Sequence, residues 1–333
     1  MRTLVATLAL LALLAAGCGR ERPSDQAVTD TLSEEEATGG FGEEELAISG
    51  RVQVDGSSTV APLVTLAAER FGKEEPGVRV TVGVAGTGGG FERFCAGETD
   101  LSNASRAIED EEKQACAKKR IAYREIQVAN DGISVVVNPA NDWADCLTVD
   151  QLKRIWAPGS RVKSWKDVDP SFPDERLMLF GPGTDSGTFD FFTEKIVGEE
   201  GASRSDYSAT EDDNVIVNGV GGGKGALGYL GLSYVEQNKG KLRAVEVDGG
   251  DGCVAPTAET VQDGTYKPLS RPLLVYANVD ALEEKLQVSA FLEFLLDNQR
   301  SLAKGALFVP LTDDQLNRSR TVLEGSGIDA GEE

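Results

Sequence analysis

The fold is set first by the stretch at residues 51–71, which reads RVQVDGSSTVAPLVTLAAERF. Its first residues, Arg51–Val54, have the alternating apolar pattern of a short strand. Gly56–Thr59 then form a loop of glycine and hydroxyl residues. The remaining apolar residues recur at helical spacing, at Val60, Leu63, Val64, Ala67 and Phe71. The stretch therefore predicts a strand, a polar loop and a helix in direct succession.

The same succession occurs twice more along the chain. Residues 78–84 predict a strand that leads through Gly86–Gly90 into a short helix. Residues 177–180 predict another strand, which leads through residues 181–188 into a helix. We expect further strands at residues 132–138, 228–232, 242–247 and 273–277, and helices at about 281–296 and 312–323. Strands that alternate with helices predict an α/β fold of mostly parallel sheets flanked by helices.

Each of these loops has the chemistry of an anion site. At a helix start the first amides lack partners and the helix dipole favours negative charge, while glycine allows a close approach and hydroxyls add donors. A single Ser or Thr before a helix is usually only a cap. Three such loops together predict a site for a small tetrahedral oxyanion. Arg106 could add a bidentate donor, or it could pair with the acidic run Glu109–Glu112.

Composition excludes several classes of function. The 333 residues carry a net charge of −22 and no histidine. The charge argues against nucleic-acid binding, and the absence of histidine argues against most hydrolases and zinc sites. We therefore expect no metal, no cofactor and no enzyme activity. The alternative is a phosphatase or serine hydrolase that uses Ser58 or Ser186.

The N-terminus has the pattern of an export signal. Residues 1–17 form a short basic end and an apolar run, followed by Cys18. This resembles the cleavage site of bacterial lipoproteins, in which Cys18 would be lipidated; the alternative is an ordinary secretory signal. Residues 18–49 are acidic and predict a disordered tether. We expect an exported protein anchored by lipid at the outer face of the cytoplasmic membrane (periplasmic in a Gram-negative host).

Four strings carry a resemblance to a known family. They are DGSSTVAP at 55–62, GTGGG at 86–90, DLSNASR at 100–106 and GPGTDSGT at 181–188. Their order is similar to that of the phosphate-binding protein (PstS family) of the Pst ABC importer, and the similarity runs from about residue 52 to 323. It implies a type II periplasmic-binding fold with two lobes, a two-crossing hinge and a cleft between the lobes. The implied function is the capture, by a monomer, of inorganic phosphate for a membrane permease. The alternatives are another oxyanion, such as sulfate, or a phosphate sensor.

The resemblance also assigns site residues. By motif, the ligand-binding residues would be Ser58, Thr59, Thr87, Ser186, Gly187 and Thr188. The chain departs from the best-known members twice: Gly181–Gly183 replaces an arginine, and Ser105 with Arg106 replaces an aspartate. We therefore expect Ser105 and Arg106 to bind the ligand. Asp131 is the candidate acceptor for the proton of phosphate, and its alternative role is that of a turn residue before Gly132.

The two lobes suggest how the cysteines pair. We expect lobe I at residues 50–128 and 270–327 and lobe II at residues 129–269. Apart from Cys18 the chain has four cysteines, which allow three pairings. We favour Cys95–Cys116 and Cys146–Cys253, because each pair then closes within one lobe. The alternative is free, buried thiols.

Overall fold

The computed structural model describes residues 48–184 and 186–325. The expected signal segment, Cys18 and all but the last two residues of the expected tether lie outside the described residues. Within the described ranges, no helix combines the length and the apolar character that crossing a bilayer requires.

The first lobe is built from both ends of the described chain. Its elements are β1 (Gly50–Gly56), α1 (Ala61–Glu74), β2 (Val78–Val82), α2 (Gly86–Cys95), β3 (Leu101–Ala104), α3 (Asp110–Lys119), the first part of β4 (Tyr123–Val137), β11 (Ser270–Asn278), α10 (Val279–Glu284), α11 (Leu286–Asp297), α12 (Gln299–Gly305) and α13 (Asp313–Leu323). Its strands lie in the order β2-β1-β3-β11-β4. The apolar residues of α1 predicted at helical spacing are all buried, and Phe71 packs on Phe291 and Phe294 at centroid distances of 5.5 and 5.3 Å.

The second lobe is formed by the middle of the chain. Its elements are the rest of β4, β5 (Cys146–Thr148), α4 (Val149–Trp156), α5 (Trp165–Val168), β6 (Met178–Pro182), α6 (Gly187–Phe192), the π-helical turn η1 (Thr193–Val197), β7 (Ser208–Thr210), α7 (Asp213–Gly221), β8 (Ala226–Gly231), α8 (Leu232–Gln237), β9 (Arg243–Asp248), β10 (Cys253–Val254) and α9 (Ala258–Gln262). Its strand order is β4-β8-β6-β7, and β9 pairs with β4, β5 and β10. Its main core packs around Trp156, Trp165 and Tyr229.

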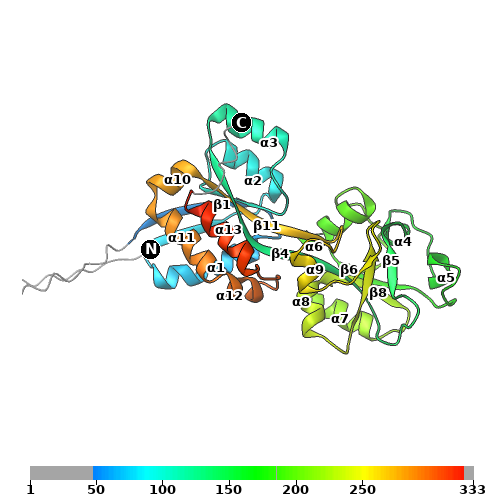
Figure 1. The fold of residues 1–333 in the computed structure, drawn as a ribbon. Helices are drawn as coiled ribbons and strands as arrows, with labels where there is room; N and C mark the ends of the chain where they lie inside the picture. The colour runs from blue at the N-terminus through cyan, green and yellow to red at the C-terminus, as the bar shows by residue number, and fades with distance from the viewer. Residues whose placement is uncertain (1–47, 185, 326–333) are drawn as a thin grey trace, which may run out of the picture. The chain divides into compact units, whose positions relative to one another are not determined.

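Strand β4 passes from one lobe into the other (Figure 1). It pairs with β11 as far as Gly132, and from Ile133 onward it pairs with β8. Asp131–Gly132 is therefore continuous strand, and the alternative of a turn at Asp131 is wrong. Along β4 the buried clusters separate at this point, since the last β4 residue in the lobe I cluster is Ala129 and the first in the lobe II cluster is Ile133.

Two further features differ from simple expectation. The helix expected at about 281–296 is broken at Lys285, whose backbone is extended and whose ammonium group pairs with Asp100 at 2.6 Å. The sheets are also mixed, because β4 and β11 are antiparallel neighbours at the middle of the strand order.

Each lobe contains one disulfide that connects two of its elements. Cys95–Cys116 joins α2 to α3, and Cys146–Cys253 joins β5 to β10. These are the two pairs that the sequence favoured.

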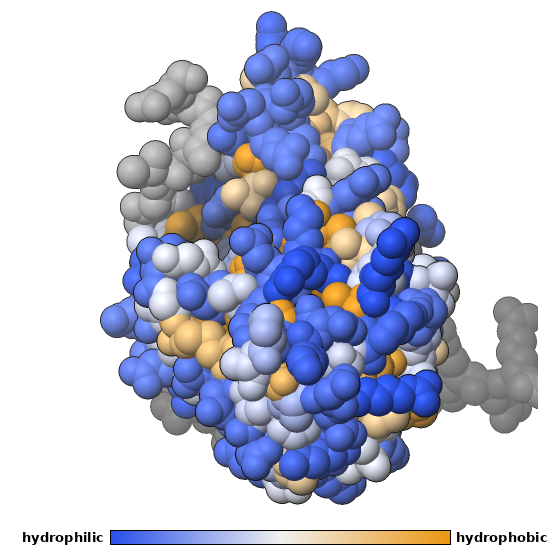
Figure 2. Space-filling view, turned by 90° about the vertical axis from the view of Figure 1, so that its right-hand side faces the viewer, coloured by the Kyte–Doolittle hydropathy of each residue, from blue (hydrophilic) through white to orange (hydrophobic). Residues whose placement is uncertain are grey.

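The surface is mainly polar on the face that Figure 2 draws, with small, separate hydrophobic patches. Within the described residues, the large hydrophobic side chains that are exposed are Val84, Val215 and Leu286. They come from three different elements or loops, so they do not indicate a large apolar interface.

Candidate functional site

The three glycine- and hydroxyl-rich segments contribute to one cavity of about 590 Å³. Its walls come from both lobes and from the first residues of β11. The lining residues are Ser57–Thr59, Ala85–Gly89, Ser105–Ala107, Gly187, Asp190, Phe191, Glu194, Lys195, Glu200 and Ser270–Pro272. Of the predicted ligand residues, the structure brings together Ser58, Thr59, Thr87, Ser105, Arg106 and Gly187. Asp131, Ser186 and Thr188 are not among the lining residues.

The first loop leaves its hydroxyls available. Gly56 has a φ of +133°, and a Cβ there would lie 2.2 Å from the carbonyl oxygen of Asn103, so only glycine fits this turn. The N-cap of α1 is Val60, and no side chain caps the helix. Ser58 and Thr59 are thus not occupied by the capping role that such residues usually have.

The second loop begins helix α2. The hydroxyls of Thr87 and Ser105 are 3.2 Å apart, and the Ser105 amide donates to Thr87 Oγ1 at 3.3 Å. These contacts hold the two predicted residues side by side on the cavity wall.

The third loop differs, because its serine is already in use. Ser186 Oγ accepts a hydrogen bond from the amide of Thr188 at 3.2 Å, so Ser186 caps α6. Gly187 lies against the first loop: a Cβ there would be 2.2 Å from Thr59 Oγ1 and 3.2 Å from Ser58 Oγ. The two lobes therefore meet at Gly187 and Thr59.

Arg106 lines the cavity but is also paired. Its Nη1 and Nη2 each donate to a different oxygen of Glu112 at 2.8 Å, and its Nε lies 3.2 Å from Glu109. The alternative suggested by the sequence, an ion pair with the acidic run, is what the structure contains.

Arg271 is the cation that the sequence reasoning missed. It is the second residue of β11, is only 9% exposed and lines the cavity. Its Nε donates to Asp131 Oδ2 at 3.0 Å, and its Nη2 donates to Thr59 Oγ1 at 3.0 Å and to the Gly187 carbonyl at 3.2 Å. The guanidinium carbon lies 3.9 Å from the centre of the Phe191 ring. A signal was available, because Arg271 directly follows the expected boundary between lobe II (129–269) and the second part of lobe I (270–327), which is where the chain is expected to cross the cleft.

Arg271 stays charged, and one of its nitrogens has no acceptor among the described residues. Burial lowers the pKa of Arg271, while the Asp131 carboxylate acts in the opposite direction. Among the described residues, none accepts a hydrogen bond from its Nη1. Arginine remains protonated even when buried, so Nη1 is a charged donor that no residue described by the structure engages.

Lobe II also contributes carboxylates to the cavity lining. Asp190, Glu194 and Glu200 line the cavity together with Lys195. Burial raises the pKa of Asp190, the charge of Glu200 raises it further, and Arg271 lowers it. An anion would therefore be favoured on the wall formed by Arg271 and the first two loops rather than beside these carboxylates.

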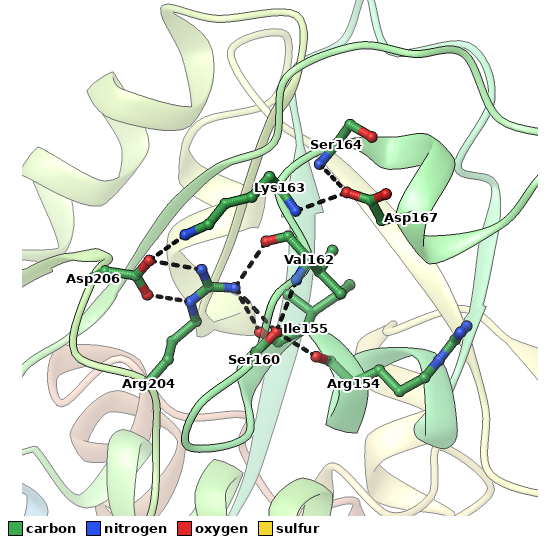
Figure 3. A network of polar contacts seen from close by, with 9 residues as sticks. All are labelled: Arg154, Ile155, Ser160, Val162, Lys163, Ser164, Asp167, Arg204 and Asp206. Atoms are coloured by element: carbon green, nitrogen blue, oxygen red, sulfur yellow. Dashed lines mark hydrogen bonds and ion pairs between the residues drawn. The ribbon is translucent and has the colours of Figure 1, made fainter.

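A second buried arginine has a different role. Arg204 donates to Asp206 at 2.6 and 2.9 Å, and its Nη1 reaches the carbonyls of Ile155 and Val162 at 3.0 and 3.3 Å (Figure 3). Lys163 also pairs with Asp206 at 2.6 Å. These partners all belong to lobe II, and Arg204 does not line the cavity. This network holds loops of lobe II together.

No described residues form a cluster of three or more His, Cys, Asp or Glu side chains able to hold a metal ion. Besides its three carboxylates and Lys195, the cavity offers hydroxyls, backbone amides and two arginines, which suit an oxyanion.

A family model described as a PBP superfamily domain matches residues 33–299 of the chain. The chain belongs to this superfamily of periplasmic-binding-protein folds, which agrees with its two-lobed α/β architecture.

Individual relatives place the chain more closely. The phosphate-binding protein PstS of Staphylococcus saprophyticus is 41% identical over 276 residues, which cover 83% of this chain and 85% of the relative. The protein SphX of Synechocystis is 42% identical over 271 residues, or 81% of each chain. A solved structure, described as a possible phosphate binding protein from Planctomyces limnophilus, is 43% identical with a TM-score of 0.79, and the match covers 84% of this chain and 99% of that one. Within the superfamily, the chain belongs to the PstS family of phosphate-binding proteins.

Proposed function

We propose that this protein captures inorganic phosphate outside the cytoplasm and delivers it to the permease of an ABC importer. The observation that carries the proposal is Arg271, a buried cation at a cavity rich in hydroxyls and amides, whose Nη1 has no acceptor in the described ranges 48–184 and 186–325. Membership of the PstS family supports the choice of phosphate. The protein acts as a binding protein, and we propose no catalytic step for it.

We propose that phosphate lies against the wall formed by the first loop, the start of α2 and Arg271. Ser58, Thr59 and Thr87 offer hydroxyls there, and Arg271 offers the charge. The cavity, at about 590 Å³, is far larger than one oxyanion. We therefore expect the lobes to close on the ligand by bending at β4 and at the start of β11, as hinged binding proteins do.

We propose that Asp131 contributes to the exclusion of sulfate. Near neutral pH, phosphate keeps at least one proton that a carboxylate can accept, whereas sulfate has none. A buried carboxylate that faces sulfate would remain unpaired, at a cost of about 1–3 kcal/mol or more. Asp131 is 6% exposed and uses Oδ2 for Arg271, and its Oδ1 accepts no hydrogen bond from any described residue. Asp131 does not line the cavity in this structure, so we assign Oδ1 to the phosphate proton in the closed form, after the lobes have moved together.

Calorimetry with phosphate and with sulfate tests this proposal. We expect tight binding of one phosphate per chain and binding of sulfate that is weaker by about a hundredfold or more. Equal affinity for the two anions would favour a general oxyanion carrier, and no binding of either would refute the proposal. Asp131→Asn should narrow the ratio between phosphate and sulfate, with Asp100→Asn as a control at another buried, ion-paired carboxylate. An unchanged ratio would remove Asp131 from anion discrimination.

We propose that export and lipid attachment at Cys18 hold this protein, as a monomer, at the outer face of the membrane. Cys18→Ser should abolish the incorporation of labelled fatty acid in the native host and release the protein from the membrane fraction. Retention of the label would assign the lipid to another position. Deletion of the gene should lower phosphate uptake, whereas normal uptake with altered phosphate signalling would favour a sensor.

A further inference from the structure

A buried carboxylate in lobe I ties the first two binding loops together from behind. Asp55, the sixth residue of β1, is 3% exposed and does not line the cavity. Its Oδ1 accepts hydrogen bonds from the amide of Gly56 at 2.8 Å and from the amide of Ala85 at 2.9 Å. Gly56 begins the first loop, and Ala85 is the residue before α2, on which Thr87 lies. One oxygen therefore fixes the starts of both loops.

The surrounding residues are shaped to hold this carboxylate. A Cβ on Gly83 would lie 2.6 Å from the Asp55 carboxyl group, so the space for Asp55 requires glycine at position 83. The Gly83 amide also donates to the Val54 carbonyl at 2.8 Å, which holds the ends of β1 and β2 in register. The position of the carboxylate is thus determined by the backbone on both sides.

A negative charge behind an anion site opposes ligand binding unless it is neutralised. Arg93 of α2 supplies that neutralisation, because its Nη1 pairs with Asp55 Oδ2. Its Nε also lies 3.3 Å from Glu98, but that carboxylate is exposed, so solvent screens its charge far more than that of the buried Asp55. Arg93 does not line the cavity that we assign to phosphate. It instead faces a separate cavity of about 290 Å³ that Asp55, Arg51 and Arg79 also line.

We propose that Asp55 and Arg93 form a charge-neutral anchor that positions the first two loops for phosphate. Asp55 supplies the acceptor that orients the loops. Arg93 cancels the negative charge that Asp55 introduces. Arg93 therefore raises the affinity for phosphate without contacting the ligand. Both residues are positioning residues. The inference rests on the proposed phosphate function, because the ligand's negative charge is what makes the neutralisation necessary.

The first test removes the acceptor. Asp55→Ala leaves the amides of Gly56 and Ala85 without their partner, and we expect phosphate to bind at least about tenfold more weakly. Asp100→Ala is the matched control, because Asp100 is a buried carboxylate in the same lobe that accepts from the Gln53 amide at 2.8 Å and pairs with Lys285 at 2.6 Å. It holds no binding loop, so it should lower the melting temperature with little change in affinity. Equal affinity losses in the two variants would overturn the positioning role.

The second test separates charge from structure. Arg93→Gln leaves Asp55 uncompensated, and phosphate affinity should fall about tenfold. The double variant Asp55→Asn/Arg93→Gln keeps an oxygen for the two amides and restores neutrality, so it should recover most of the affinity that Arg93→Gln lost. Arg79→Gln removes an arginine from the same cavity without affecting Asp55, and should leave affinity unchanged. A double variant as weak as or weaker than Arg93→Gln would refute the electrostatic part.

The pH dependence gives an independent readout. An uncompensated carboxylate repels a dianion about twice as strongly as a monoanion. The loss in Arg93→Gln should therefore be larger at about pH 8, where phosphate is mainly dianionic, than at about pH 6. The chain has no histidine to titrate in this interval. A loss that does not vary with pH would indicate a purely structural role. If the unaltered protein binds no phosphate, the proposed function fails, and this inference fails with it.

Discussion

Arg271 donates from Nε to Asp131 Oδ2 at 3.0 Å, and its Nη2 lies 3.0 Å from the same oxygen. The two residues face each other in register on β11 and β4, at the place where the chain passes between the lobes. Both are at least nine-tenths buried. The main charged donor of the cavity is therefore fixed to the hinge strands, and movement of the lobes must carry the surrounding loops toward or away from it.

This relationship predicts that Arg271 contributes more to phosphate affinity than any other side chain. Arg271→Met should weaken phosphate binding about tenfold to a hundredfold, because a charged hydrogen bond to the ligand is lost. Arg271→Lys should not restore full affinity, since lysine lacks the planar fork that reaches Thr59, Gly187 and Asp131 together. Isothermal titration calorimetry with phosphate measures both effects.

Removing Arg271 alone leaves the buried charge of Asp131 unpaired, which is destabilising. Arg271→Met/Asp131→Asn avoids that problem and should remain folded with weak binding. Arg204→Met is the matched control, because it removes a buried arginine that does not face the cavity. It should lower the melting temperature and leave affinity intact. An Arg271→Met/Asp131→Asn variant with unchanged affinity would remove Arg271 from the site.

For Arg106 we expect a different effect of substitution on phosphate affinity, because its guanidinium is already paired with Glu112. If phosphate recruits Arg106, the arginine must leave Glu112 first. Arg106→Ala should then weaken binding about tenfold, whereas Glu112→Gln should strengthen it about threefold by freeing the arginine. Glutamine at position 112 keeps a side-chain oxygen that can accept from the Glu109 amide, so the capping contact at the start of α3 is preserved. Titration of both variants with phosphate decides the matter, and an unaffected Arg106→Ala would assign Arg106 to α3 alone.

The sequence predicted the elements that carry strong local patterns. The strands and helices around residues 51–71 follow from their periodicity, and the three segments that contribute to the cavity follow from glycine and hydroxyl residues beside helix starts. Arg271 and Asp131 could not be paired in this way. Their contact depends on the antiparallel register of two strands about 140 residues apart in sequence, and no local pattern encodes that register.

The break at Lys285 has a similar cause. Residues 281–296 have an apolar pattern without proline or glycine, so local propensity favours one helix. The ion pair between Lys285 and Asp100, which lies beside β3, is a tertiary contact. Likewise, whether Arg106 pairs with Glu112 or with a ligand depends on where α3 begins. The sequence alone therefore left both alternatives open.

Gly187 predicts a steric requirement at the contact between the lobes. Gly187→Ala would place a Cβ 2.2 Å from Thr59 Oγ1, so the first loop would have to move away. Strain of this kind should weaken phosphate binding about tenfold. Gly88→Ala is the matched control, because Gly88 also lines the cavity but its added Cβ would meet nothing closer than Arg106 Nη2 at 3.8 Å. If calorimetry finds the same phosphate affinity for Gly187→Ala and Gly88→Ala, close contact between Gly187 and the first loop is not required for binding.

Asp206 predicts how stability depends on pH in lobe II. Hydrogen bonds from Arg204 and Lys163 hold the pKa of Asp206 well below its usual range. A depressed pKa stabilises the fold above the unfolded value of about 3.9, and this stabilisation is lost as the pH falls through the folded value. Asp206→Asn should therefore lower the melting temperature at neutral pH by about 2 °C, a modest effect because Asp206 is half exposed. The difference from the unaltered protein should shrink steadily below about pH 4, whereas Asp174→Asn, at an exposed aspartate of the same lobe, should show little difference at any pH. Melting curves that keep a constant Asp206→Asn difference down to low pH would contradict the assignment of a charged network to these loops.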